Sequence, residues 1–193
     1  MNVRFAICLA PVALLACSPA KQPSRPPLEG ARIGGPFTLV DQDGKAISDN
    51  AFAGKFRIMY FGYTFCPDIC PVDVQNLTAG LKLLEKSDPA LASRIVPIFV
   101  TIDPARDTPP VLKQFVSAFH PRMVGLTGTP DAIAKVAKEF AIYYQRGEGG
   151  ADGYLMNHSR QAYLMSPEGK PIALLPQEGP PQAIADELKR WAR

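Results

Sequence analysis

The sequence predicts an α/β domain in which helices cover one central β-sheet. Two nearly continuous apolar runs, residues 56–63 (FRIMYFGY) and 95–102 (IVPIFVTI), are typical of strands buried on both faces. Stretches with apolar residues at helical spacing follow each run. Strands that alternate with helices in this way indicate a single sheet flanked by helices.

The first half of the domain begins with a short β-hairpin over residues 37–47, whose turn is supplied by Asp43-Gly44. A helix should follow the first buried strand, because four leucine and valine residues recur there at helical spacing: Val74, Leu77, Leu81 and Leu84. Pro97 removes one hydrogen-bond donor from the second buried strand. We therefore expect a bulge or a sheet edge at that position.

The second half of the domain continues the alternation and ends in a hairpin and a helix. Proline-rich starts predict the three helices. The stretch 147–153 is polar and rich in glycine, and we expect it to be a loop. The expected elements, in order, are a helix from Thr108-Pro109-Pro110, a strand over 123–126, a helix from Thr129-Pro130-Asp131, a hairpin over 161–175 and a helix from Pro180-Pro181.

The N-terminus has the pattern of a processing signal. Arg4 precedes 12 apolar residues, 5–16, which are too few to cross about 30 Å of hydrocarbon as a helix. They are typical of a secretory signal. The end of the run, Leu14-Leu15-Ala16-Cys17, resembles a lipoprotein cleavage site, so we predict that residues 1–16, with Cys8, are removed and that Cys17 is lipidated. An uncleaved apolar segment or an ordinary secretory cleavage nearby are the alternatives; each places the remainder outside the cytoplasm.

Residues 17–36 are predicted to be an extended tether, and residues 37–193 the folded domain. The stretch 18–36 contains five prolines and three glycines, with few large apolar side chains. The 157 residues that follow can bury close to 70% of their unfolded surface without covalent cross-links. The net charge of +3 is small and evenly spread, which argues against nucleic-acid binding.

The candidate chemistry lies in the motif Cys66-Pro67-Asp68-Ile69-Cys70, between a buried strand and a helix. A helix start favours thiolate over thiol, so both sulfurs should be nucleophilic and good ligands for a soft metal. If both lie on one helical face, their Cβ atoms are about 5–6 Å apart. A structural disulfide is the alternative, although closing so short a loop stabilises a domain by only about 2 kcal/mol.

Two histidines are available as a third group beside the cysteines. His120 lies at the end of an amphipathic helix, where a side chain can bond the last carbonyls, and we interpret it as structural. His158 lies between the glycine-rich stretch and the first strand of the C-terminal hairpin. With no other partner available for the two thiolates, His158 is the favoured candidate.

Four ordered motifs together closely resemble the Sco/SenC family, and the resemblance covers nearly the whole domain. They are residues 62–71 (GYTFCPDICP), 102–109 (IDPARDTP), 125–129 (GLTGT) and 157–159 (NHS). The resemblance implies a thioredoxin-like fold and a copper chaperone for the CuA centre of cytochrome c oxidase. It implies that Cys66, Cys70 and His158 hold the metal, and that Cys66 and Cys70 form a disulfide when oxidised.

The chemistry of these three donors agrees with that implied role. Two thiolates and one imidazole suit Cu(I), which accepts low coordination numbers, with Cu(II) left open as a second state. A structural zinc takes four ligands and fits less well. The implied partners are subunit II of the oxidase and a periplasmic copper donor or thiol reductase. The membrane would be reached through the lipid anchor, on the extracytoplasmic side.

Several neighbouring residues have open roles. The family often has aspartate where this chain has Asn157, and the change removes a charge that could tune metal affinity or docking. Asp68 either complements the helix dipole or belongs to the site. Asp103, Arg106 and Asp107 either form a structural ion-pair and capping cluster or contact the metal.

The competing function is a thiol-disulfide reductase acting on the CuA-site cysteines of subunit II. The spacing argues against it, because three residues separate Cys66 from Cys70, whereas general disulfide oxidoreductases have two. His158 also has no evident place in simple dithiol exchange. A peroxidase is weaker still, since the sequence lacks a separate peroxidatic cysteine motif.

Overall fold

The computed structural model describes residues 25–150 and 153–193. Its elements are β1 (Thr38–Asp41), β2 (Ala46–Ser48), η1 (Asp49–Phe52), β3 (Phe56–Gly62), α1 (Ile69–Ser87), α2 (Pro89–Ala92), β4 (Ile95–Thr101), α3 (Pro109–Phe119), β5 (Val124–Thr127), α4 (Pro130–Glu139), β6 (Tyr144–Gly150), β7 (Gly153–His158), β8 (Ala162–Met165), β9 (Pro171–Leu175) and α5 (Pro181–Trp191). The predicted signal, Cys8, Cys17 and residues 17–24 of the tether lie outside the described residues.

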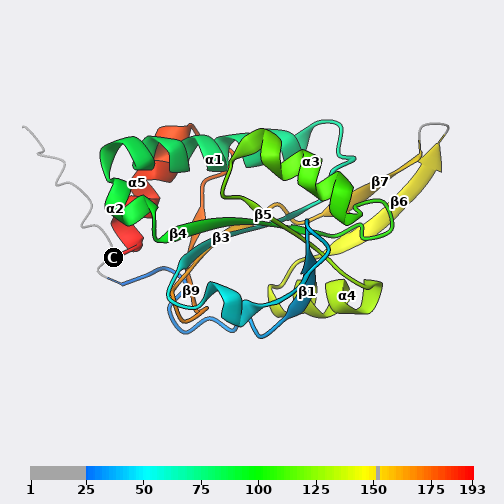
Figure 1. The fold of residues 1–193 in the computed structure, drawn as a ribbon, viewed down its shortest axis with the longest axis horizontal. Helices are drawn as coiled ribbons and strands as arrows, with labels where there is room; N and C mark the ends of the chain where they lie inside the picture. The colour runs from blue at the N-terminus through cyan, green and yellow to red at the C-terminus, as the bar shows by residue number, and fades with distance from the viewer. Residues whose placement is uncertain (1–24, 151–152) are drawn as a thin grey trace, which may run out of the picture.

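A seven-stranded mixed sheet in the order β2-β1-β5-β4-β3-β8-β9 forms the centre of the domain. Strands β3, β4 and β5 are parallel, whereas β1, β8 and β9 pair antiparallel to their neighbours. Helices α1 and α3 lie over one face and α4 over the other, with α5 packed along α1 (Figure 1). The predicted α/β architecture is therefore confirmed. No helix in the described ranges is long and apolar enough to cross a bilayer.

The two predicted buried strands form the middle of this sheet. β3 and β4 pair without interruption from Phe56↔Ile95 to Gly62↔Thr101, and every residue of β3 is buried. No bulge therefore occurs at Pro97, and the alternative expectation of a sheet edge fits the pairing there. β4 has β5 as a second neighbour only from Ile98 onward, so the proline lies where β4 is paired on one side alone. The missing donor is tolerated there because a ladder on that side has not yet begun.

The last part of the predicted tether lies against the domain. The Leu28 amide donates to the Ile172 carbonyl at 3.0 Å, and the Gly34 amide donates to the Glu139 carbonyl at 2.8 Å. Leu28 and Ile33 pack against the hydrophobic core. The packed part of the chain therefore begins before Phe37. Leucine and isoleucine bury enough apolar surface to hold this proline-rich stretch in place.

Residues 147–150 and 153 of the glycine-rich stretch, expected to be a loop, belong to a separate two-stranded ribbon. β6 and β7 pair antiparallel from Tyr144↔His158, with a register shift between Arg146 and Gly149. The ribbon extends away from the main sheet (Figure 1). Near its tip, the Tyr154 hydroxyl donates to Asp103 at 2.8 Å. For these residues the loop expectation was wrong. Glycine has a low strand propensity, but the pairing of β6 with β7 and tertiary contacts such as the Tyr154 hydrogen bond override it.

Candidate metal centre

The two cysteines lie on either side of the start of α1. Asp68 is the N-cap of the helix and Ile69 its first residue, so Cys66 belongs to the preceding loop and only Cys70 is helical. The expectation that both lie on one helical face is therefore wrong. They are close all the same, because the Cys70 amide donates to Cys66 Sγ at 3.3 Å. Both are free thiols in the structure.

Gly62, the last residue of β3, makes room for the second cysteine. A Cβ atom at this position would lie 3.1 Å from Cys70 Sγ and 3.0 Å from Tyr60 Cε1. Few real side chains tolerate either distance. Glycine therefore allows the fully buried Cys70 sulfur to lie against the end of the central strand.

His158 reaches this sulfur from the ribbon. It is the last residue of β7, and its Nε2 atom lies 3.3 Å from Cys70 Sγ. Its Nδ1 atom lies 2.7 Å from the Ser159 carbonyl oxygen. Since a carbonyl oxygen can only accept, Nδ1 carries the proton and donates, which leaves the Nε2 lone pair directed at the sulfur. Tyr63 supports the ring edge-on, with the ring centroids 5.9 Å apart.

A hollow of about 600 Å³ is lined by Cys66 and His158 but not by Cys70. Cys66 lies half-buried in its wall, whereas Cys70 is completely buried. Large apolar side chains at or beside its rim are exposed: Phe65, Ile69, Tyr143 and Leu155. Cys66 and His158 are therefore reachable from one side, through an opening with an apolar border, whereas Cys70 is not.

The two thiols have opposite acidities. The pKa of Cys66 is lowered to about 5, because the Cys70 thiol and the backbone amides of Cys70, Asp68 and Ile69 donate to its sulfur. The pKa of Cys70 is raised, because the neighbouring Cys66 sulfur accepts its proton and because the site is buried. The expectation that both sulfurs are nucleophilic thiolates is therefore wrong for Cys70 in the metal-free protein. The helix start activates the cysteine that precedes it, and burial deactivates the other.

These contacts bring the predicted donors together but do not form a complete coordination site. Within the described ranges, no three histidine, cysteine, aspartate or glutamate side chains meet in the arrangement of a complete metal site. Cys70 contacts both other members, one through its amide and one through its sulfur. The arrangement places two sulfurs and one imidazole close together. The half-buried Cys66 side chain faces the hollow and has room to move when an ion binds.

A buried ion pair that the sequence analysis missed ties the ribbon to α1. Asp73 is fully buried and accepts from the Tyr60 hydroxyl at 2.8 Å and from Arg160 at 2.8 and 3.1 Å. Burial raises the pKa of Tyr60, which keeps this hydroxyl a donor. Arg160 follows His158 by two residues, so the pair fixes the chain just after the imidazole. A signal was present, because Asp73 lies on the apolar stripe of the helix, four residues before Leu77.

The acidic and basic residues with open roles form a separate network. Asp107 is buried and accepts from Thr64 and Thr101, while Asp103 pairs with Arg106. The Asp103–Arg106 contact supports the ion-pair interpretation, whereas the N-cap of α3 is Thr108 and forms no side-chain cap hydrogen bond.

The Arg106 guanidinium also lies over the rings of three aromatic residues, Tyr63, Phe65 and Tyr154. Its role is to hold the cysteine loop against the ribbon.

The remaining candidates lie at the edge of the site or away from it. The Asp68 side chain is exposed and forms no cap hydrogen bond, although its backbone amide helps to lower the pKa of Cys66. Asn157 is exposed in the wall of the hollow. His120 is buried at the end of α3, where its Nδ1 accepts from the Arg122 amide at 3.1 Å. This contact supports the structural interpretation of His120.

Comparison with known proteins places the chain in one family. The sequence model of SCO1/SenC matches residues 25–193. The chain belongs to the SCO1/SenC family. Members of this family are copper-binding proteins involved in cytochrome c oxidase assembly. The predicted thioredoxin-like fold is confirmed by solved structures of the family.

Two solved structures and one sequence relative illustrate the similarity. ScoI of Bradyrhizobium japonicum, solved with copper bound, is 37% identical with a TM-score of 0.74, covering 82% of this chain and 99% of its own. BsSco, described as having a disulfide switch and as a member of the Sco family of cytochrome c oxidase assembly proteins, is 26% identical with a TM-score of 0.63, covering 82% and 93%. The mitochondrial SCO1 homolog 1 of Arabidopsis thaliana is 42% identical over 72% of this chain. The chain spans only 40% of that relative's length.

Proposed function

We propose that this protein is a membrane-anchored copper metallochaperone that delivers copper to the CuA centre of cytochrome c oxidase subunit II. Cys66, Cys70 and His158 hold the ion. The observation that carries the proposal is the contact of 3.3 Å between His158 Nε2 and Cys70 Sγ, with the Nδ1 proton committed to the Ser159 carbonyl. An imidazole fixed in this tautomer directs its Nε2 lone pair toward the Cys70 sulfur, so both atoms are placed to bind the same ion.

The donor set fits copper as cargo. Thiolate and imidazole ligands suit Cu(I), and three donors are fewer than the four that a structural zinc takes. Cys66 is a thiolate at neutral pH, and Cys70 loses its proton when the metal binds. The open side of the hollow leaves room for the ligands of a recipient protein to replace these donors in turn. The copper-bound structure of the B. japonicum relative supports the same assignment.

Lipidation of Cys17 would hold this opening near the membrane, on the extracytoplasmic side. The sequence from residue 14 to 17 supports the anchor, and the proline-rich stretch after it supplies the reach. The protein would then encounter the CuA domain of subunit II at the membrane surface. A periplasmic copper donor or thiol reductase would supply the metal or reduce the two thiols.

Anaerobic loading with Cu(I) tests the metal site. The wild-type protein should hold close to one copper per chain, measured by metal analysis after desalting. His158→Ala should bind at least about tenfold more weakly in competition with a Cu(I) chelator, since one of three ligands is lost. Cys66→Ser should lose copper altogether. Lys189→Ala, which changes an exposed residue of α5 outside the hollow, is the control and should load as the wild type does.

Two results would contradict this site. If His158→Ala competed for Cu(I) as well as the wild type, the imidazole would not be a ligand. If Cys66→Ser kept its copper, the ion would be bound elsewhere on the chain.

A second candidate function, reduction of the CuA-site cysteines, is favoured by one observation. Cys66, with a pKa of about 5, has the character of an attacking thiolate, and the buried Cys70 thiol lies beside it. Cys66 would attack a disulfide in subunit II and form a mixed disulfide. Cys70 would then lose its proton, attack the Cys66 sulfur and release the reduced target. The protein would be left with a Cys66–Cys70 disulfide for an external thiol reductase to reduce.

Cys70→Ser separates the two functions. In a reductase, this variant traps a mixed disulfide between Cys66 and the oxidised CuA domain, which non-reducing electrophoresis detects. Cys66→Ser is the control and should trap nothing. If Cys70→Ser forms no adduct while the wild type transfers copper to the reduced CuA domain, the chaperone remains and the reductase is rejected.

A further inference from the structure

Met156 differs from the other methionines that the structure describes. The described residues contain four methionines. Three of them, Met59, Met123 and Met165, are at most 5% exposed and belong to the hydrophobic core. Met156 is only partly buried, and it lines the same hollow as Cys66 and His158. Its thioether sulfur therefore lies in the neighbourhood of the proposed metal donors.

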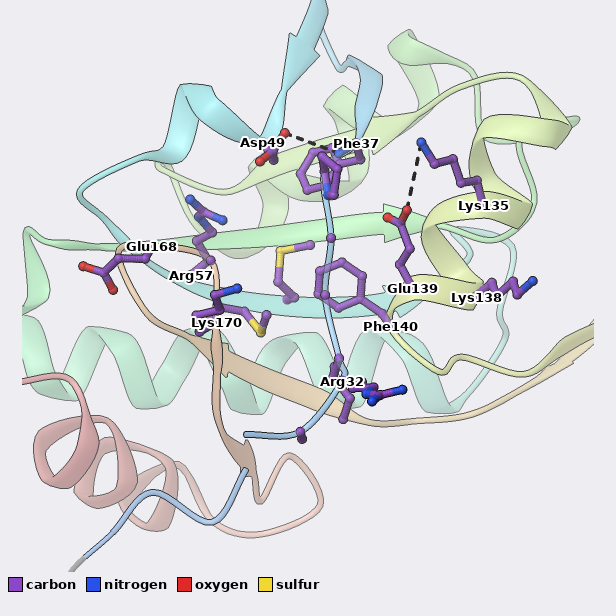
Figure 2. A pocket seen from close by; sticks show the side chains of 18 residues that line it. Arg32, Phe37, Asp49, Arg57, Lys135, Lys138, Glu139, Phe140, Glu168 and Lys170 are labelled. Carbon is purple, nitrogen blue, oxygen red and sulfur yellow. Dashed lines mark hydrogen bonds and ion pairs between the residues drawn. The ribbon is translucent and has the colours of Figure 1, made fainter. Parts of the chain in front are cut away.

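A second hollow, of about 820 Å³, offers a comparison at the opposite end of β3 from the cysteine loop. Met59 and Met165 are among its lining residues. The side chains labelled around it in Figure 2 are charged or aromatic, and its described lining residues include neither cysteine nor histidine. A thioether in that hollow has no thiol or imidazole beside it, whereas Met156 shares its hollow with both.

The alternation of β7 turns Met156 toward the domain. Exposed and partly buried residues alternate along this strand, and Tyr154, Met156 and His158 are the partly buried ones. Side chains two residues apart on a strand lie on the same face. Both neighbours on this face reach the domain, since Tyr154 donates to Asp103 and His158 Nε2 lies 3.3 Å from Cys70 Sγ. Met156 lies between them on the face that is turned toward the metal donors.

Tyr63 connects this part of β7 to the cysteine loop. Burial raises the pKa of Tyr63, and the Met156 backbone amide, which donates to the Tyr63 hydroxyl, opposes that rise. The Tyr63 ring also lies edge-on to His158. Tyr63 lines the hollow and precedes Cys66 by three residues. One aromatic side chain therefore fixes both Met156 and His158 relative to the loop that carries Cys66.

We propose that Met156 supplies a fourth donor, a thioether sulfur, to the copper ion held by Cys66, Cys70 and His158. This inference rests on the proposed function, because it concerns the same ion. Met156 and His158 are about 7 Å apart along the strand. The three rotatable bonds of methionine let its sulfur move toward an ion bound to the imidazole. The thioether is neutral, so it adds no charge to the site and releases no proton when it binds.

The fourth bond makes the site more selective for Cu(I). Thioethers are soft ligands that suit Cu(I), whereas zinc in proteins is bound by cysteine, histidine and carboxylate side chains. Met156 therefore strengthens the binding of Cu(I) and adds nothing to the binding of zinc. A thioether is also a weak electron donor, so its bond to copper is the first that a ligand of a recipient protein replaces.

Simple packing is the alternative reason for a methionine at this position. Leucine fills nearly the same volume as methionine and lacks the sulfur. Met156→Leu therefore removes the donor and keeps the packing. Met123→Leu makes the same chemical change in the core, at a residue that does not line the hollow, and is the matched control.

Competition with chelators measures the contribution of the thioether. The reduced full-length protein competes with a Cu(I) chelator and, in a parallel titration, with a zinc chelator. Met156→Leu should weaken Cu(I) binding several-fold, by less than His158→Ala does, and should leave zinc binding unchanged. Met123→Leu should behave as the wild type does in both titrations.

Selenomethionine labelling detects the bond itself. X-ray absorption at the selenium edge of the labelled, copper-loaded protein should show a copper neighbour. Met156→Leu should lose this neighbour, and Met123→Leu should keep it. This readout does not depend on affinity, and a purely structural role of Met156 would not produce it.

Three results would overturn the proposal. Selenium could show no copper neighbour in the loaded protein, or Met156→Leu could bind Cu(I) as tightly as Met123→Leu does. Met156→Leu could also weaken copper and zinc binding equally, which indicates a loss of structure. In each case the wild type still loads copper, so the proposed function stands. A wild type that takes up no copper refutes the proposed function itself.

Discussion

Replacing Asp73 with asparagine measures how firmly the protein holds the strand that carries His158. The carboxylate is completely buried and accepts three hydrogen bonds, one from Tyr60 and two from Arg160. Asparagine keeps the shape, but it removes the charge and turns an NH₂ group toward one of the donors. The guanidinium is thereby left without its buried partner.

The magnitude follows from how much of the pair is accessible to water. Breaking a fully buried ion pair costs about 3–5 kcal/mol. The Arg160 side chain is 34% exposed and also contacts Glu178 at 2.7 Å, so it recovers part of its solvation. We expect Asp73→Asn to lower the free energy of unfolding by about 2 kcal/mol. For a chain of this size, that lowers the unfolding temperature by about 4–8 °C.

Thermal and denaturant unfolding of the metal-free protein measure this loss, and Cu(I) competition measures its effect on the site. Asp73→Asn should also weaken copper binding several-fold, because Arg160 no longer fixes the chain after His158. Tyr60→Phe removes one hydrogen bond and keeps the ion pair, so it should lose about 1 kcal/mol. Lys113→Ala removes an exposed pair with Asp43 and should change nothing measurable. An unfolding temperature for Asp73→Asn equal to that of the wild type refutes the reasoning.

Three further results are expected. Iodoacetamide should label Cys66 at a rate that falls as the pH drops through about 5, where its thiolate is protonated, and that is level at neutral pH; Cys70 should stay unlabelled. A labelling midpoint near the ordinary thiol pKa of about 8.5 would contradict this acidity. Gly62→Ala should cost about 2 kcal/mol in denaturant unfolding, because the added methyl meets Cys70 Sγ at 3.1 Å; an unchanged midpoint would count against it. Thr129→Ala should cost about 1 kcal/mol through loss of the cap to the Ala132 amide, while Thr129→Ser should retain it.

Much of the fold was predictable because its signals are local. The β3 and β4 strands are continuous apolar runs, and the helices α3, α4 and α5 begin at prolines. The ribbon β6–β7 could not be predicted in this way. Its pairing depends on contacts such as that of Tyr154 with Asp103, which lies 51 residues away. Local propensity says nothing of such a contact.

In the candidate site, too, features with a local sequence signal were predictable, and features that depend on distant contacts were not. The spacing of Cys66 and Cys70 and the scarcity of histidine pointed to three residues that the structure brings together. Their unequal acidity was not predictable, because it depends on which sulfur is buried beneath the helix start. Asp73 was overlooked for a related reason. A charged residue on an apolar stripe needs a partner, and Arg160 lies 87 residues further along the chain.

The placement of His158 on a ribbon of its own has a consequence for how an ion would leave. The sulfurs belong to the main body of the domain, whereas the imidazole belongs to two strands that pair only with each other in the described structure. Two-stranded units are marginally stable by themselves, so the contacts of Arg160 with Asp73 and of Tyr154 with Asp103 determine how readily this one opens. Fraying of this ribbon would detach one donor and leave the dithiol intact. The affinity for the ion would then fall in steps. A recipient protein that binds the ribbon would promote release of the ion.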